Sequence, residues 1–299
     1  MRRGWADLDG NGHYWPSQPS PASPTTPVDP LISPDFTGWW QRGTTLMTRI
    51  WRPALAVNLV AAVPMALVAV PVQITINHEL ASLRTATRLA EVTGALTATG
   101  LMLASTLVTF LLHVIAVLIT AQLVILVATG RPPGIRAALA TSVRRIPALI
   151  GWNAVTAVLT GAAFLCCVLP AFYFAVVLLV LPVVVLLEPG RGVGRCFQIF
   201  HVDFGASATR AGTLFGLGMA CESLASVADF LTDPSIGLTD PGPILSTFQA
   251  VLSVLLYVVY GVLGTPLLVT AYADMRARTE PFSTAHLITP PTTRPAPPS

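Results

Sequence analysis

The stretch from Ile146 to Leu187 constrains the fold most strongly, because its 42 residues include no Asp, Glu, Lys or Arg. A single helix of that length would span about 63 Å, whereas the hydrocarbon core of a bilayer is about 30 Å thick. Two crossings fit the stretch. The break is predicted at Cys166-Cys167-Val168-Leu169-Pro170, where the proline marks the start of a second helix. The centre of the chain is therefore predicted to form a transmembrane hairpin.

The composition of the chain also indicates a membrane protein. Hydrophobic residues make up 53% of it and charged residues 10%, whereas soluble domains carry about 25% charged residues. The net charge of +3 is too small to indicate nucleic-acid binding. Met1-Arg2-Arg3 is not followed by an apolar segment before residue 46, so a secretory signal is not expected and the first membrane helix should direct targeting.

The periodicity and length of the apolar runs predict an all-α polytopic bundle of six transmembrane helices. The expected spans are 53–77, 103–127, 147–167, 170–187, 208–230 and 244–273. The fifth span is the weakest, because it carries several glycines and Glu222. Short cytoplasmic helices lying in the headgroup region are expected at Trp39–Trp51, Gly134–Arg145 and Val193–Phe204.

The arginines predict the orientation. All 17 basic residues are arginines, and 15 of them fall in the two terminal segments and in the loops after the second and fourth spans, which lie on one side of the membrane. Only Arg84 and Arg88 fall on the other side. Because basic residues concentrate in cytoplasmic segments, both termini are expected in the cytoplasm, with the spans in the cell membrane. Residues 1–36 and 284–299, rich in Pro, Ser and Thr, are expected to be disordered tails that flank a transmembrane domain at 37–283.

Several motifs resemble a family of bacterial six-helix membrane proteins common in actinobacteria, which is related to the membrane domain of glycerophosphoryl diester phosphodiesterases. The matching residues are Leu169-Pro170-Ala171-Phe172-Tyr173, Pro182-Val183-Val184-Val185-Leu186-Leu187-Glu188, Gly192-Val193-Gly194-Arg195 and Tyr272-Ala273-Asp274-Met275-Arg276-Ala277-Arg278-Thr279-Glu280-Pro281-Phe282. The last of these is similar to the family's Tyr-x-Asp-x-Arg-x-Arg-x-Glu-x-Phe ending and is the most specific. The resemblance covers about residues 40 to 283.

The resemblance implies a membrane module without a catalytic partner. In the related enzymes a separate soluble barrel performs the hydrolysis, and such a barrel needs about 250 residues, which no soluble segment here approaches. The chain contains neither a Gly-x-Ser-x-Gly elbow nor a Gly-x-x-x-x-Gly-Lys phosphate loop. The function expected first is therefore a non-enzymatic membrane module, acting as a scaffold or as a lipid-contacting subunit.

Glu222 and His113 form the candidate polar site inside the membrane. An ionisable group at the depth of Glu222 is costly and indicates function, and His113 is expected at a comparable depth. The pair is suited to proton relay or cation binding, so the alternative function is a small transporter or proton-coupled carrier. The structural alternative is that Glu222 is protonated, or is hydrogen-bonded to Ser223, Ser226 or an amide such as Asn153, and holds helices together.

Further patterns predict packing and lipid contacts. Gly212-x-x-x-Gly216 is expected to let another helix approach closely inside the bundle, with dimerisation as the alternative. Glu188, Asp203 and Asp274 are expected to pair with nearby arginines such as Arg191, Arg195 and Arg276 at the helix ends. Four arginines are candidate contacts for anionic lipid headgroups, namely Arg136, Arg144, Arg145 and Arg195.

Metal sites are not expected. Asp7–Gln18 resembles a calcium loop in its first six positions, but Gln18 stands where a bidentate Glu is needed. His78-Glu79 begins like a zinc-protease motif, but Ser82 replaces the second histidine. No cofactor is predicted, and the expected partners are membrane lipids and other membrane proteins; the oligomeric state is left open.

Overall fold

The computed structural model describes residues 29–82, 88–231 and 242–287. The described residues form helices joined by short connections and contain no strand, which confirms the all-α class. The helices, in order, are α1 (Phe36–Ser82), α2 (Arg88–Ala128), α3 (Ile135–Val143), α4 (Ile146–Cys166), α5 (Val168–Leu178), α6 (Leu181–Leu187), α7 (Val193–Val202), α8 (Phe204–Leu231), α9 (Pro243–Thr279) and a 3-10 turn (Thr284–Leu287).

Within the described residues, five helical segments are long and apolar enough to cross a membrane, as in a multi-pass membrane protein. They are Phe36–Glu79, Thr93–Ala128, Ile146–Cys166, Val168–Leu187 and Pro243–Thr279. The predicted fifth span corresponds to α8, which is not among these segments. The structure therefore confirms five of the six predicted spans as candidate crossings.

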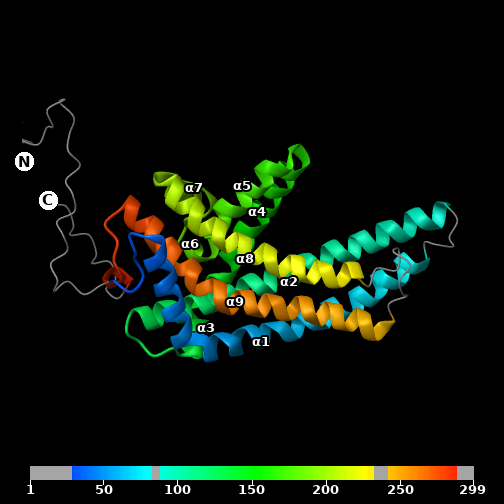
Figure 1. Cartoon of the computed structure of the whole chain (residues 1–299), viewed down its shortest axis with the longest axis horizontal. Coiled ribbons are helices and arrows are strands. Elements are labelled where there is room, and N and C mark those ends of the chain that lie inside the picture. The colour runs from blue at the N-terminus through cyan, green and yellow to red at the C-terminus, as the bar shows by residue number, and fades with distance from the viewer. Residues whose placement is uncertain (1–28, 83–87, 232–241, 288–299) are drawn as a thin grey trace, which may run out of the picture.

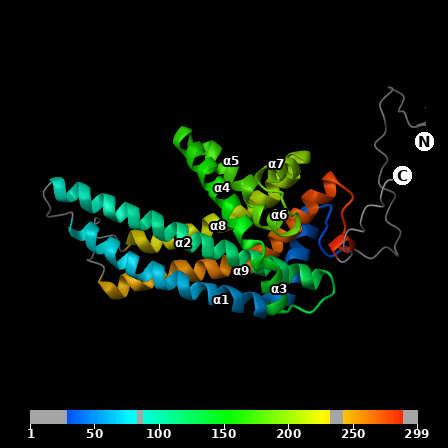
Figure 2. The ribbon, with the colours of Figure 1, turned by 180° about the vertical axis from the view of Figure 1, so that it is seen from behind.

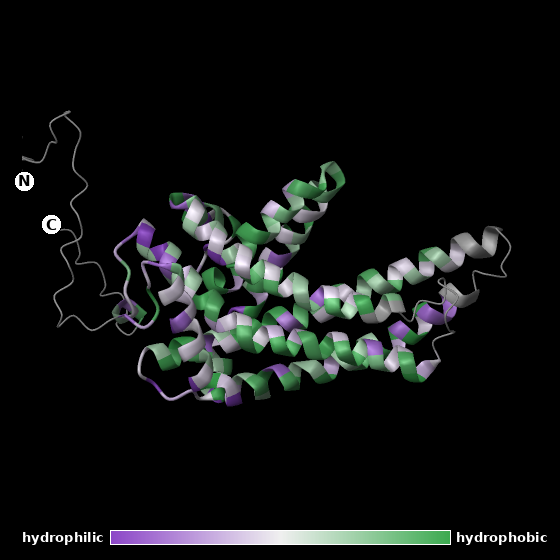
Figure 3. Ribbon diagram, viewed as in Figure 1, coloured by the Kyte–Doolittle hydropathy of each residue, from purple (hydrophilic) through white to green (hydrophobic). Residues whose placement is uncertain are grey.

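The helices form a long bundle with a projecting hairpin. Helices α1, α2, α8 and α9 run side by side along the long axis of the molecule, and α4 and α5 project away from it (Figures 1 and 2). With 47 residues, α1 would measure about 70 Å if straight, more than twice the thickness of a hydrocarbon core. Figure 3 shows hydrophobic residues along both the bundle and the hairpin. The hairpin is therefore apolar although few of its residues pack against other helices.

The central hairpin breaks where the sequence predicted. Cys167 adopts an extended conformation (φ −170°, ψ 147°) between α4 and α5. The predicted fourth span, however, is not one helix. It is interrupted at Leu179 and Val180, just before Pro182, and α6 then turns into the core with six of its seven residues buried. Because this interruption lies within an uncharged apolar run, hydropathy alone could not locate it.

Two of the three predicted short helices are separate elements. They are α3 and α7, which precede the hairpin and α8. The prediction of a separate helix at Trp39–Trp51 is wrong, since this segment is the beginning of the continuous helix α1. The helix continues through this segment without a break, and Pro53, Pro64 and Pro71 also lie within α1.

The largest hydrophobic core lies at the end of the bundle where α1 begins and α9 ends. Its largest fully buried side chains include Trp39, Phe200 and Tyr272. Cys196 is also buried there, and burial raises the pKa of its thiol to about 12, so this cysteine remains protonated and packs as a small apolar residue. The helices that meet at this end of the bundle pack around this core.

The segment before α1 is bound to the end of α9. The Ser33 amide donates to Asp274 Oδ1 (2.5 Å), and the Thr284 hydroxyl donates to Asp29 Oδ1 (2.6 Å). Leu31 is 1% exposed. Residues 29–35 fall within the predicted tail, so the ordered part of the chain begins earlier than expected and brings the two terminal segments together.

Close helix approach occurs at glycines other than the predicted pair. A Cβ at Gly212 or Gly216 would have no atom within 4 Å, so the expected contact at Gly212-x-x-x-Gly216 is wrong. A Cβ at Gly43 would lie 2.4 Å from Leu267 Cδ2 and 3.3 Å from Leu267 Cα. At Gly261 it would lie 2.2 Å from the Asn58 Oδ1 atom. Glycine is thus required where α1 crosses α9.

Replacing Gly43 with valine is expected to destabilise the protein by about 1–3 kcal/mol, because the added atoms must displace Leu267 and part of its backbone. Gly100→Val is the matched control, since a Cβ at Gly100 meets nothing within 4 Å. Thermal unfolding of the detergent-solubilised variants measures the difference. Equal loss of stability in both variants would show that α1 and α9 do not meet closely at Gly43.

Candidate functional site

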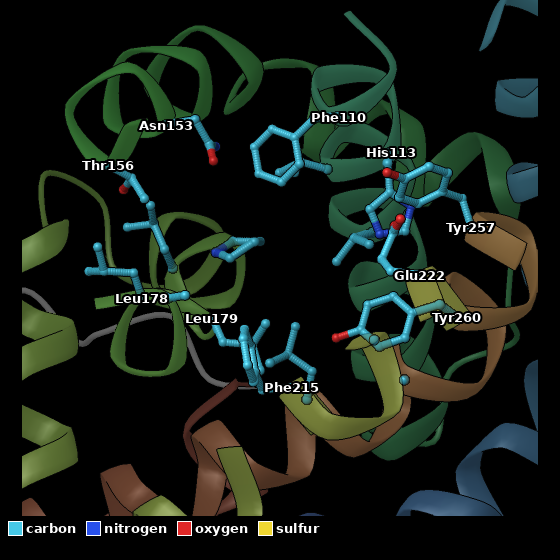
Figure 4. Close-up of a pocket in the computed structure, with 18 of the residues that line it drawn as sticks. Phe110, His113, Asn153, Thr156, Leu178, Leu179, Phe215, Glu222, Tyr257 and Tyr260 are labelled. Atoms are coloured by element: carbon cyan, nitrogen blue, oxygen red, sulfur yellow. The ribbon is translucent and has the colours of Figure 1, made fainter. Parts of the chain in front are cut away.

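A cavity of about 490 Å³ lies between the projecting hairpin and the long bundle. Its walls come from α2, α4, α5, α6, α8 and α9, so it depends on the angle at which the hairpin leaves the bundle. Figure 4 shows Asn153 and Thr156 on one side and His113, Glu222, Tyr257 and Tyr260 on the other. Most of the remaining lining is aliphatic or aromatic. The cavity is thus apolar, with polar groups on two facing walls.

The bundle wall brings Glu222 and His113 together. The His113 ring lies 5.2 Å from the Tyr257 ring and 5.9 Å from the Tyr260 ring, measured between centroids. Tyr257 and Glu222 lie next to each other on this wall (Figure 4). His113 is buried, whereas Glu222 is exposed to the cavity. The sequence therefore identified two residues of a four-residue polar and aromatic group.

The hairpin wall contributes three polar side chains from α4, at Asn153, Thr156 and Thr160. The Asn153 amide donates to the Leu149 carbonyl oxygen (2.9 Å). The hydroxyl oxygens of Thr156 and Thr160 are buried and have no hydrogen-bond partner within the described part of the chain. Buried hydroxyls are normally paired, so these two are available to a polar group in the cavity.

The structural alternative for Glu222 does not take the expected form. Asn153 donates to the Leu149 carbonyl oxygen instead, and the side chain beside the Glu222 carboxylate is that of Tyr257 on α9 (Figure 4). Ser226 donates to the backbone carbonyl of Glu222, at 2.9 Å. Tyr257 and Tyr260 were not predicted from the sequence, although their spacing of three residues places both on one face of a helix.

The four arginines proposed for lipid contact lie in two environments. Arg136 and Arg144 are exposed and Arg145 is half-buried, all at or beside α3. Arg195 is instead buried in α7, where it donates to Glu188 (2.8 Å), Gln198 (3.0 Å) and Glu280 (3.0 Å). The side chain of Arg195 therefore joins α7 to the end of α9, unlike the other three.

Ion pairs gather at the end of the bundle, as expected, and Glu188 pairs with two of the expected arginines, Arg195 and Arg276. Asp274 pairs instead with Arg210 at 3.1 Å, and Asp203 with Arg278. Burial alone would raise the pKa of Glu280, but the hydrogen bond from Arg276 and the charges of Arg276 and Arg195 lower it. Nearly all positions that carry the Tyr-x-Asp-x-Arg-x-Arg-x-Glu-x-Phe ending take part in this cluster.

The role of that ending is visible in its contacts. The Tyr272 hydroxyl donates to Glu188 (2.6 Å), and the Arg276 guanidinium lies 4.5 Å from the centroid of the Phe282 ring. The alternate spacing thus places each polar residue against a different neighbour at the end of α9. The motif therefore has a structural role, because its side chains hold the end of α9 against the neighbouring residues.

Comparison with known proteins gave no match to a family model, a curated protein or a solved structure.

Proposed function

We propose that the protein is a non-enzymatic, lipid-contacting membrane module that binds an amphiphilic molecule in the cavity between the hairpin and the bundle. The observation that carries this proposal is the cavity itself, which has the volume of a small-molecule site and an apolar lining with a few facing polar groups. Its lining includes Phe110 and Met219, which are 41% and 42% exposed, so the cavity opens to the surface through apolar side chains.

The direction of that opening supports an amphiphile rather than a water-soluble ligand. The hairpin next to the opening exposes large apolar residues, including Leu165 at 88% and Leu169 at 76%. Such residues are stable when they face hydrocarbon. A molecule with an apolar tail can then enter from the lipid, place its tail along the lining, and reach the polar walls with its other end.

A sixth crossing at α8 completes the proposed topology. The start of α1 and the end of α9 lie together, because Trp39 Nε1 donates to the Leu267 carbonyl oxygen (3.1 Å) and the Ser33 amide to Asp274. An even number of crossings is needed to return the chain to the side on which it began, and α8 runs beside α9 (Figure 1). The arginines near this end support its assignment to the cytoplasm of a bacterial cell.

The exposed arginines at α3 support contact with anionic lipids. Ile135, Leu139 and Val143 are each at least 40% exposed and follow one face of α3, while Arg136 and Arg144 flank them. An apolar face beside basic residues is typical of a helix lying in the headgroup region. This contact, together with the cavity, supports membrane lipids as partners of the protein.

Photo-crosslinking tests the cavity. An uncharged twelve-carbon alcohol carrying a diazirine on its chain is added to the protein in lipid nanodiscs, and the labelled peptides are mapped by mass spectrometry. We expect labels on the lining segments of α4, α8 and α9. Ala157→Phe, which fills the cavity from α4, should reduce labelling about tenfold, a loss of about 1.4 kcal/mol in binding.

Ala154→Phe is the matched control, because Ala154 lies on the same helix and does not line the cavity. Ala175→Phe fills the cavity from α5 and serves as an independent second variant. Equal labelling of all variants, or labels spread evenly over lipid-facing residues, would contradict a specific site.

Proton-coupled transport is the second candidate function. It is favoured by one observation, that Glu222 and His113 share a wall of the cavity. In that case Glu222→Gln would abolish uptake into proteoliposomes while leaving the protein inserted. Retention of uptake by this variant would contradict proton coupling through Glu222. The resemblance to the membrane domain of glycerophosphoryl diester phosphodiesterases remains a proposal and is compatible with either function.

A further inference from the structure

We infer that the amphiphile bound in this cavity is an organic cation, with its positive group at Glu222 and the neighbouring aromatic rings and its hydrocarbon tail along the apolar lining. The inference rests on the proposed function and adds the chemical class of the ligand to it. Three features of the cavity lead to this class, namely its charge, its aromatic residues and its lack of metal-ligand geometry.

The charge of the cavity favours a cation. Glu222 is the acidic residue of the described lining, which contains neither lysine nor arginine. Within the described part of the chain, Glu222 forms no ion pair, although other carboxylates at the end of the bundle do. In a site of low dielectric constant the interaction between opposite charges is much stronger than in water. A ligand cation therefore supplies the missing counter-charge, and an anion is repelled.

The aromatic residues beside Glu222 favour an organic cation. The rings of His113, Tyr257 and Tyr260 are clustered, with centroids between 5.2 and 5.9 Å from that of His113. Tyr260 is held in place between Gly218 and Gly264, where added Cβ atoms would lie 3.4 and 3.3 Å from its ring. Aromatic faces attract cations, and groups of such rings recognise alkylammonium ions that cannot donate hydrogen bonds.

The same geometry argues against a metal cation. Calcium binds six to eight oxygen ligands and magnesium six, mostly from carboxylates, carbonyls and water. The described residues contain no group of three or more His, Cys, Asp or Glu side chains able to hold a metal ion. One carboxylate among aromatic rings matches a large, weakly hydrated cation, for which charge and ring contacts suffice.

The rest of the lining accommodates an apolar tail. It continues from Tyr257 and Phe215 to aliphatic residues of α2, α5, α6 and α9 and of the break between α5 and α6, namely Val114, Val117, Leu178, Leu179, Leu181 and Leu268. The volume of about 490 Å³ lies within the range of sites for drug-sized ligands. The hydroxyls of Thr156 and Thr160 lie on the opposite wall, where they can receive a second polar group or water.

The experiment compares three photoprobes that share one diazirine-bearing twelve-carbon chain and differ in the headgroup, which is trimethylammonium, hydroxyl or sulfate. Each is titrated against the full-length protein in nanodiscs of uncharged lipid, and labelling of the cavity peptides is quantified. We expect the trimethylammonium probe to reach half-maximal labelling at about tenfold lower concentration than the alcohol, and the sulfate to label least.

Two variants locate the source of this preference. Glu222→Gln preserves the shape of the side chain and should remove the preference, so that the cationic probe and the alcohol reach half-maximal labelling at similar concentrations. Tyr260→Leu should weaken the cation selectively, while Tyr260→Phe keeps the ring and should retain the preference. Glu280→Gln is the matched control, because it removes a carboxylate from the arginine cluster outside the cavity.

Equal labelling by the cation and the alcohol in the unmodified protein would overturn the inference and leave the proposed function intact. A preference for the cation that persists in both Glu222→Gln and Tyr260→Leu would also overturn it. Failure of all three probes to label the cavity would overturn the proposed function together with the inference. If Glu222→Gln does not fold, the Tyr260→Leu and Tyr260→Phe pair still decides the outcome.

Discussion

Replacing Arg210 with alanine is expected to lower the free energy of unfolding by about 3–5 kcal/mol, because the change leaves the Asp274 carboxylate buried without its counter-charge. The two side chains are 4% and 1% exposed and lie 3.1 Å apart. Arg210 also donates to the backbone carbonyls of Ser33 and Asp35. Its loss should therefore release the segment before α1 as well as the end of α9.

Arg278→Ala is the control for this prediction. Arg278 pairs with Asp203, but these side chains are 28% and 39% exposed, so the pair should contribute no more than about 1 kcal/mol. Chemical unfolding in a mild detergent, followed by circular dichroism, measures both variants. If Arg278→Ala proved as destabilising as Arg210→Ala, burial of the Arg210–Asp274 pair would not be the source of the effect.

Trp39→Ala is expected to destabilise the protein by about 3–5 kcal/mol, because it empties a fully buried position in the largest core. The indole also donates to the Leu267 carbonyl oxygen (3.1 Å), so the substitution removes one buried hydrogen bond as well. Trp39→Phe should lose less, since it keeps most of the apolar volume and removes the donor.

The neighbouring residue provides a matched control. Trp40 has the same side chain one position later in α1 and is 41% exposed, so Trp40→Ala should change the free energy of unfolding by about 0.5 kcal/mol or less. The same unfolding measurement ranks the three variants. Similar losses at positions 39 and 40 would mean that this part of α1 lies in the headgroups, as the sequence alone suggested, and not in the core.

Hydropathy predicted the helices well where charge marks their ends. The uncharged run between Arg145 and Glu188 predicted the hairpin, and the length of this run predicted the break near Cys167. The interruption at Leu179 and Val180 was not predictable, because apolar residues on both sides give the same pattern whether a helix continues or bends. The aromatic residues of Trp39–Trp51 indicated membrane anchors, whereas packing against α9 buries Trp39.

Of the candidate site, the sequence predicted only the residues that are energetically costly to place inside a membrane. Glu222 and His113 stood out because ionisable groups are rare within apolar spans. Tyr257, Tyr260 and Thr156 did not, since tyrosine and threonine are ordinary residues of membrane helices and their role depends on which helix faces them. The glycine spacing was misleading for a similar reason: Gly212 and Gly216 form the known pattern, but the close contacts between α1 and α9 occur at Gly43 and Gly261.

The contact between α1 and α9 has a consequence for biogenesis. The Asn77 amide on α1 donates to Ser246 and Gln249 on α9 (2.8 and 3.2 Å), so α1 finds these partners only after α9, which follows it in the chain, has been synthesised. Until then this asparagine lacks them, at a cost that lipid cannot relieve. The contact between α1 and α9 therefore forms late in assembly, when α9 has been released from the ribosome.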